Sequence, residues 1–209
     1  QTTVNAVIPR FNEFIRIWPT IEELSKVKES KILRFWSGLG YYVRAGNLLK
    51  SIKLIAKKHN YIIPEAYKHL MQLPGVGDYT AKAIQGIAYN KPVIPIDANI
   101  ERIVTRIYGI TQVIKDAKSQ IDELAKKLIS IKNSRNFIQS LMDYGSTICL
   151  PKVPKCNKCV IQNHCVAFKK NLTNKIPIKK TKNNSKAIKF TRAYLIVNEF
   201  NEILIRRRP

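Results

Sequence analysis

The 209-residue sequence is poor in acidic side chains, with 14 Asp and Glu against 37 Lys and Arg, which leaves a net charge of +23. It has no run of the ~18 apolar residues that a membrane-spanning helix needs, and no secretory signal follows Gln1. A hydrophobic share of 45% excludes a wholly disordered or collagen-like chain. The positive excess favours a polyanionic partner, either nucleic acid or an anionic membrane. A sequence bias towards Lys, Ile and Asn accounts for part of that excess.

Cysteine is absent from the first 148 residues, and all four cysteines follow within a short segment, as Cys149, Cys156, Cys159 and Cys165. A secreted disulfide scaffold would be smaller and would spread its cysteines. The cluster therefore predicts a metal site. Four thiolates can bind zinc or an iron–sulfur cluster. Structural zinc usually takes two close pairs, and here only Cys156 and Cys159 form one.

Apolar residues recur at helical spacing through most of the chain, so the sequence predicts an all-α fold. Thr20 before Glu22 and Glu23 is an N-cap signal. Pro9 falls inside the first pattern, where it either kinks the helix or lies in its first turn. The expected helices cover residues 3–17, 30–36, 42–58, 64–73, 79–89, 98–108, 117–130 and 134–147.

Composition changes at residue 169, which divides the chain into expected parts. Residues 169–189 hold eight Lys and four Asn without an acid or an aromatic, which predicts a basic linker. Runs 190–197 and 203–205 then predict two strands around a turn at 199–202. We expect a helical core at 1–148, a cysteine loop at 149–168, the linker at 169–189, and the truncated start of a second domain at 190–209.

The segment Leu73-Pro74-Gly75-Val76-Gly77 joins two expected helices. Its two glycines allow positive φ at both places, so Gly75, Val76 and Gly77 can aim backbone N–H groups outward. Such a turn before a helix N-terminus suits a DNA phosphate. A simple tight turn is the alternative, and the basic surroundings favour the phosphate. The turn and its flanking helices resemble the helix-hairpin-helix of DNA repair glycosylases.

Asp97 follows the apolar run Pro92–Ile96 and opens the helix at 98–108. Asp is a preferred N-cap residue, which is one interpretation. A carboxylate at a pocket mouth can also stabilise an oxocarbenium-like sugar cation during glycoside cleavage. Asp97 lies 20 residues beyond Gly77, where helix-hairpin-helix glycosylases keep their catalytic aspartate. That resemblance favours the catalytic role, and both roles can hold together.

Nearly the whole chain resembles the MutY family of adenine DNA glycosylases, which remove adenine mispaired with 8-oxoguanine. Besides the turn and the Asp97 segment, the resemblance rests on the four-cysteine spacing, typical of a [4Fe–4S] loop, and on residues 7–11, 36–42 and 44–48. It implies a [4Fe–4S] cofactor held by the four cysteines. It also implies that the strands after Phe190 begin a domain related to nucleotide-cleaving Nudix domains.

The resemblance also assigns candidate roles. Asp97 would stabilise the sugar cation, Asn99 would position that carboxylate, and Tyr79 would line the site. Endonuclease III, a bifunctional lyase, carries its nucleophilic lysine at the position of Tyr79, so Schiff-base chemistry is not expected. The family's general-acid glutamate would lie just upstream of Gln1. The expected DNA contacts are Gln1, the wedge residues Leu39 and Tyr41, the turn residues Gly75, Val76 and Gly77, and Lys152 and Lys155 of the cysteine loop.

Three rival functions remain open. A thymine-mismatch glycosylase fits Tyr79 and the sequence Asp97-Ala98-Asn99, because the MutY family usually has Gly in place of Ala98. A bifunctional lyase is disfavoured by Tyr79. A non-catalytic DNA-binding fragment would use the hairpin and cleave nothing. The expected partner is duplex DNA with A:8-oxoguanine or A:G mismatches, bound by a monomer in the bacterial cytoplasm.

Overall fold

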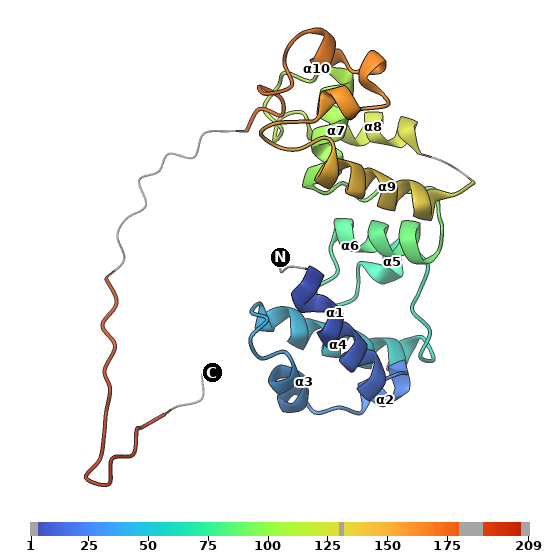
Figure 1. Cartoon of the computed structure of the whole chain (residues 1–209). Coiled ribbons are helices and arrows are strands. Elements are labelled where there is room, and N and C mark those ends of the chain that lie inside the picture. Colours follow the sequence, from blue (N-terminus) through green and yellow to red (C-terminus); the bar gives the residue numbers. More distant parts are fainter. Residues whose placement is uncertain (1–3, 130–131, 180–189, 206–209) are drawn as a thin grey trace. The chain divides into compact units, whose positions relative to one another are not determined.

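The computed structural model describes residues 4–129, 132–179 and 190–205 of the chain. It divides into two compact units, residues 1–179 and residues 180–209. The first unit is helical, as predicted (Figure 1). Its first half contains α1 (Val4–Ile17), α2 (Ile21–Ser25), α3 (Glu29–Phe35), α4 (Tyr42–Lys58), α5 (Tyr67–Leu70) and α6 (Asp78–Ala83).

Helices α1 to α4 share one apolar core. Edge-to-face ring contacts join Phe14, Trp18 and Phe35, with centroids 5.1–5.7 Å apart. Pro9 lies inside α1 beyond its first turn. The predicted cap of α2 is confirmed, since the Thr20 side chain accepts a hydrogen bond from the Glu23 N–H. The buried residues of this core are Trp18, Leu24, Val27, Ile32, Ala45, Leu49 and Ile52.

The helices around the glycine turn are shorter than the sequence predicts. The helix expected from residue 64 forms only over α5, and Gly77, not Asp78, is the N-cap of α6. The expected helix 79–89 is α6 followed by a π-helical turn, η1 (Ile84–Ala88). The widened turn goes with close packing at Gly86, where a Cβ would lie 3.0 Å from the Val93 carbonyl oxygen.

The second half of this unit is built on α7 (Ala98–Tyr108), α8 (Lys118–Leu128) and α9 (Ser134–Thr147). The bounds predicted for α7 and α9 are confirmed. An apolar core lies between the helices, formed by Ile94, Ile100, Val104, Ile110, Ala117, Ile121 and Ala125. None of the helices in the described part of the chain is long and apolar enough to cross a membrane.

After α9 the chain forms the cysteine loop, with short 3₁₀ turns η2 (Cys156–Lys158) and η3 (Gln162–His164), and then α10 (Val166–Lys169). The first residues of the predicted linker pack onto the helical unit instead of extending from it. Ile176 is buried, and Val113 and Ile178 form a parallel β-bridge. The helical unit therefore continues to residue 179.

The two strands predicted after Phe190 do not form over their full length. In the described residues 190–205, Val197 and Ile203 make an isolated antiparallel bridge. The turn between them is held by the Asn198 N–H, which donates to the Glu202 carbonyl at 3.0 Å. A lone two-stranded hairpin buries too little apolar surface to be stable in water, and Phe190 and Tyr194 are exposed here.

Candidate functional site

The glycine turn between α5 and α6 is fixed from α4. The Ser51 hydroxyl donates to the Pro74 carbonyl at 2.7 Å. Gly75 has a φ of +77°, and a Cβ there would lie 2.8 Å from the Asn47 Cβ, so both conformation and space require glycine. Gly77 does not use the positive φ that a glycine allows: its φ is −101°, in the extended region. Gly77 leaves space instead, because a Cβ built there meets no described atom within 4 Å.

Asp78 ties the two helices of the hairpin together. Its carboxylate accepts from the Tyr67 hydroxyl at 2.8 Å and pairs with Lys82 at 3.0 Å. Partial burial opposes the charged form, but the hydrogen bonds from Lys82 and Tyr67 outweigh it, so the pKa of Asp78 lies below its ordinary value of 3.8. The ionised carboxylate is therefore favoured by folding.

Asp78→Asn should destabilise the protein at pH 7 by about 0.5 kcal/mol, since an exposed i,i+4 pair contributes little. A pKa lowered by folding gives stability that is present above the unfolded value and is lost as pH falls through the folded one. The difference in melting temperature between wild type and variant should thus shrink below about pH 4. Circular dichroism melts at pH 7 and pH 3 measure it, and an equal difference at both would contradict it.

Asp97 is the N-cap of α7, as one of the two interpretations predicts. Its Oδ1 accepts from the backbone N–H groups of Asn99 at 2.9 Å and Ile100 at 2.7 Å. The Asn99 side-chain amide donates to Oδ2 at 3.1 Å. The carboxylate is half-buried and fixed by three donors. Asn99 therefore contacts the carboxylate that the resemblance assigns it to position.

Arg102 contacts Asn99, the residue whose side chain holds this carboxylate. The sequence analysis did not identify it. It is 5% exposed, and its Nη2 donates to Asn99 Oδ1 at 2.8 Å and to the Gly145 carbonyl at 2.6 Å. Its Nε donates to the Cys149 carbonyl at 2.6 Å. The pKa of this guanidinium is lowered, chiefly by burial. The signal available was two arginines, 102 and 106, one turn apart on a helix with Ile103 and Val104 between them.

Tyr79 lies one residue after the start of α6 and is 44% exposed. Burial and then the negative charge of Asp97 raise the pKa of its hydroxyl. Tyr79 also lines a cavity of about 780 Å³ together with Gly75, Val76 and Tyr41. The glycine turn and Tyr41 of the predicted wedge therefore line the same cavity.

The predicted wedge loop has an unusual backbone. Gly38, Gly40 and Tyr41 have φ of +84°, +69° and +49°, and the Trp36 indole N–H donates to the Gly40 carbonyl at 3.1 Å. A bulky residue in the left-handed region costs about 1–2 kcal/mol, and such strain collects at functional sites.

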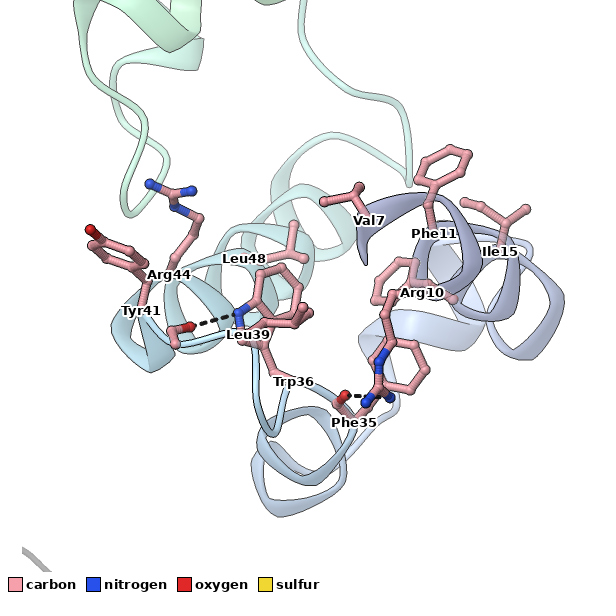
Figure 2. A pocket seen from close by; sticks show the side chains of 12 residues that line it. Val7, Arg10, Phe11, Ile15, Phe35, Trp36, Leu39, Tyr41, Arg44 and Leu48 are labelled. Atoms are coloured by element: carbon pink, nitrogen blue, oxygen red, sulfur yellow. Dashed lines mark hydrogen bonds between the residues drawn. The ribbon is translucent and has the colours of Figure 1, made fainter. Parts of the chain in front are cut away.

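The two wedge residues differ in exposure. Tyr41 is 61% exposed, with its ring beneath the Arg44 guanidinium. Leu39 is half-buried, and it lines an apolar pocket of about 410 Å³ with Trp36 and with Phe11 of α1 (Figure 2). The structure therefore exposes Tyr41 and holds Leu39 partly inside the protein.

The four cysteine side chains come together, although the chain separates them. All four are free thiols and line one small cavity of about 30 Å³ with Arg106. Burial, followed by the neighbouring cysteines, raises the pKa of the Cys156 thiol. Tyr144 lies beside them: burial and then a hydrogen bond with Cys159 raise its pKa to about 12. Lys152 and Lys155 lie on the same loop, and both are exposed.

The four thiols have the donor chemistry of a metal or iron–sulfur site held by sulfur ligands. A tetrahedral zinc with Zn–S bonds of about 2.3 Å needs its sulfurs about 3.8 Å apart. The described residues hold no group of three or more His, Cys, Asp or Glu side chains placed for one metal ion. A [4Fe–4S] cluster takes each thiolate at a separate iron, so it does not need the four sulfurs around one ion.

Gln1 lies outside the described residues, so its predicted DNA contact has no structural account. Among the other candidates, the structure brings Asp97 to Asn99, Tyr79 and Tyr41 to the turn residues, and the four cysteines to one another. Lys152 and Lys155 lie on the cysteine loop, apart from the lining of the cavity that holds Tyr79.

Comparison with known proteins gives three kinds of match. Residues 1–130 match the model of the HhH-GPD superfamily base excision DNA repair protein. The adenine DNA glycosylase of Buchnera aphidicola subsp. Acyrthosiphon pisum is 39% identical over 184 residues, covering 87% of this chain and 53% of that protein. The chain thus spans about half the length of the curated relatives it matches.

Two solved structures resemble the helical unit. A thermostable thymine-DNA glycosylase superposes with a TM-score of 0.74 at 29% identity, covering 81% of this chain and 79% of the other. A trapped endonuclease III–DNA covalent intermediate superposes with a TM-score of 0.68 at 23% identity over the same shares. At that identity the second match bears on the fold alone.

Proposed function

Because the chain belongs to the HhH-GPD superfamily of base excision DNA repair proteins, we propose that it hydrolyses the N-glycosidic bond of adenine mispaired with 8-oxoguanine or guanine in duplex DNA. The observation that carries the proposal is the Asp97 carboxylate, fixed by three hydrogen bonds at the first turn of α7. The adenine DNA glycosylases, which are 39% identical, support adenine as the base.

In this mechanism the adenine nucleotide leaves the base stack, since an enzyme cannot reach the glycosidic bond inside the duplex. Departure of adenine leaves positive charge on the sugar, and the Asp97 carboxylate stabilises that charge. The fixed position matters because preorganised charge needs no rearrangement as the bond breaks. Tyr79 stays protonated at neutral pH, since its hydroxyl pKa is raised, and it lines the cavity beside the glycine turn.

Backbone phosphates would be held by the turn Gly75–Gly77 and by Lys152 and Lys155. The open space at Gly77 lets a phosphate approach the backbone. The exposed ring of Tyr41 would enter the duplex. Leu39 is half-buried, so it would enter only if the loop moves. Gln1 would add a contact near the lesion. In this proposal a monomer binds the DNA in the bacterial cytoplasm.

The four cysteines Cys149, Cys156, Cys159 and Cys165 would hold a [4Fe–4S] cluster, consistent with their shared cavity. When bound, the cluster supplies iron–thiolate bonds that crosslink the loop, and hydrolysis itself needs no redox step. Around it, Arg106 holds the loop by donating to the Leu150 and Pro151 carbonyls at 2.7 and 3.0 Å.

A single-turnover assay of the full-length protein tests the proposal. Duplexes carrying one A:8-oxoguanine, A:G or T:G pair are incubated with excess enzyme and treated with alkali to cut abasic sites. Cleavage of the adenine strand that requires alkali supports the proposal. Cleavage of the thymine strand would support a thymine-mismatch glycosylase instead, the activity named for the structural relative at 29% identity. Binding without cleavage would indicate a DNA-binding scaffold.

Tyr79 provides a second test, because we propose a monofunctional enzyme without lyase activity. Wild type should form no borohydride-trapped complex with DNA, since no amine stands at position 79 to form a Schiff base. Tyr79→Lys should gain a trapped complex, seen as a slower band on a denaturing gel. Tyr79→Phe is the matched control and should trap nothing. Trapping by wild type would contradict the monofunctional assignment.

A further inference from the structure

Helix α9 passes unusually close to the start of α7. Gly145 of α9 is buried, and a Cβ built there would lie 2.6 Å from the Asn99 Cβ and 3.2 Å from the Asn99 Cα. Real side chains do not tolerate the first distance, and the second involves backbone. Any residue larger than glycine must push α9 away from the first turn of α7.

The backbone of Gly145 also joins the hydrogen bonds behind Asp97. Its carbonyl accepts from Arg102 Nη2 at 2.6 Å, and the same nitrogen donates to Asn99 Oδ1 at 2.8 Å. Asn99 in turn donates to Asp97 Oδ2 at 3.1 Å. Gly145 is therefore linked to the Asp97 carboxylate in two indirect ways. It packs on Asn99, and its carbonyl shares the Arg102 guanidinium with Asn99.

Local helix stability does not account for a glycine here. Glycine inside a helix costs about 1 kcal/mol relative to alanine, and Gly145 does not have the left-handed φ that favours glycine. Gly145 lies within α9, two residues before the last residue of the helix, Thr147. Close approach to Asn99 is the structural feature that distinguishes this position.

We propose that Gly145 is a positioning residue for the reaction: the absence of a side chain lets Asn99 and Arg102 hold the Asp97 carboxylate where the sugar cation forms. This inference rests on the proposed function of Asp97. Displacing a reacting group by about 1 Å can cost about 10²-fold in rate. A methyl group at position 145 forces a shift of that order, because the 2.6 Å contact must lengthen to an ordinary distance of 3.4 Å or more.

The first experiment compares Gly145→Ala with Gly46→Ala in the full-length protein. Gly46 is the matched control, a buried glycine inside α4 whose Cβ would meet only the end of the flexible Glu29 side chain, at 3.2 Å. Gly145→Ala should lower the single-turnover rate of base release about 10²-fold. Its affinity for a duplex with a non-cleavable adenosine analogue should change less than about threefold. Gly46→Ala should leave both unchanged. A wild-type rate in a folded Gly145→Ala protein would overturn the inference.

A double-mutant cycle separates positioning from general damage. If Gly145 acts through Asn99, adding Gly145→Ala to Asn99→Gly should lower the rate little further, because Asn99→Gly removes both the amide and the Cβ that the new methyl group would meet. Independent structural damage would multiply the two losses. If Gly145→Ala fails to fold, the Arg102→Lys variant tests the inference instead. Lysine lacks the guanidinium fork that bonds Cys149 together with Asn99 and Gly145, so the rate of this variant should fall at least tenfold with DNA affinity retained, and a wild-type rate would overturn the inference.

One readout is independent of activity. The Asn99 side-chain amide donates to Asp97 and accepts from Arg102, so its protons should show a shifted and exchange-protected pair of resonances in amide spectra of wild type. Gly145→Ala should move that pair towards the free-amide position, and Gly46→Ala should not. An unmoved pair would overturn the inference. Wild type that releases no base would contradict the proposed function alone, because the amide signal still tests the packing.

Discussion

Replacing Asp97 by asparagine is expected to lower the single-turnover rate of base release by about 10³-fold while leaving thermal stability nearly unchanged. The rate falls because the site loses its negative charge, and one lost preorganised electrostatic contact typically costs about 10²–10³-fold. Stability persists because asparagine is as good an N-cap as aspartate. The amide oxygen of the new side chain can still accept from the Asn99 and Ile100 N–H groups that bond Oδ1 in the wild type.

Asp97→Ala serves as the comparison, because it removes the charge and the cap together. It should lose as much rate as Asp97→Asn and also about 1 kcal/mol of stability. Quenched-time-point gels measure the rate, and circular dichroism melts measure the stability. If Asp97→Asn retained more than about a tenth of the wild-type rate, Asp97 would be a structural cap and the catalytic assignment would be wrong.

Arg106→Leu is expected to destabilise the helical unit by about 3–5 kcal/mol, the usual cost of breaking a buried charged network. Arg106 is 2% exposed and donates to three carbonyl oxygens, those of Leu150, Pro151 and Ile176, at 2.7–3.0 Å. Leucine would leave these acceptors buried without donors, which costs more than the lost bonds themselves. In a protein of this size the melting temperature should fall by about 10 °C.

Arg135→Leu is the matched control for Arg106. Arg135 also donates to backbone carbonyls, those of Ile87 and Ala88, but its side chain is exposed. Water can replace it, so the expected loss is about 1 kcal/mol or less. The comparison is made from the melting temperatures of both variants, recorded at one scan rate. Equal losses would mean that burial of the Arg106 network contributes nothing to stability.

The helix pattern was predictable where apolar spacing was regular over several turns. The bounds expected for α4, α7 and α9 are confirmed, because each helix has one face in a core. The prediction failed where tertiary packing decided the outcome. Close packing at Gly86 against Val93 accompanies a π-helical turn in place of a continued helix, and no local propensity encodes that contact.

The structure places Asp97 at the start of α7 and brings the four cysteines to one cavity. Asp97 and the cysteines were identified as candidates from their spacing along the chain, and their roles stay predictions. The residues behind them were not identified: Arg102 looks like an ordinary helix charge, and Gly145 like a weak helix residue. Their roles depend on contacts with residues 43 and 46 positions away, since Arg102 meets Gly145 and Gly145 meets Asn99. Such separations carry no period that a single sequence reveals.

The two carboxylate oxygens of Asp97 accept different numbers of hydrogen bonds. Oδ1 accepts two backbone N–H groups, which uses the roughly two lone-pair directions that a carboxylate oxygen offers. Oδ2 accepts one hydrogen bond, from Asn99, and so retains a direction. Rotation of the carboxylate would break the helix cap, which fixes which oxygen is available. The carboxylate therefore has a defined orientation as well as a position, and in the proposed reaction the sugar of the nucleotide would lie at Oδ2.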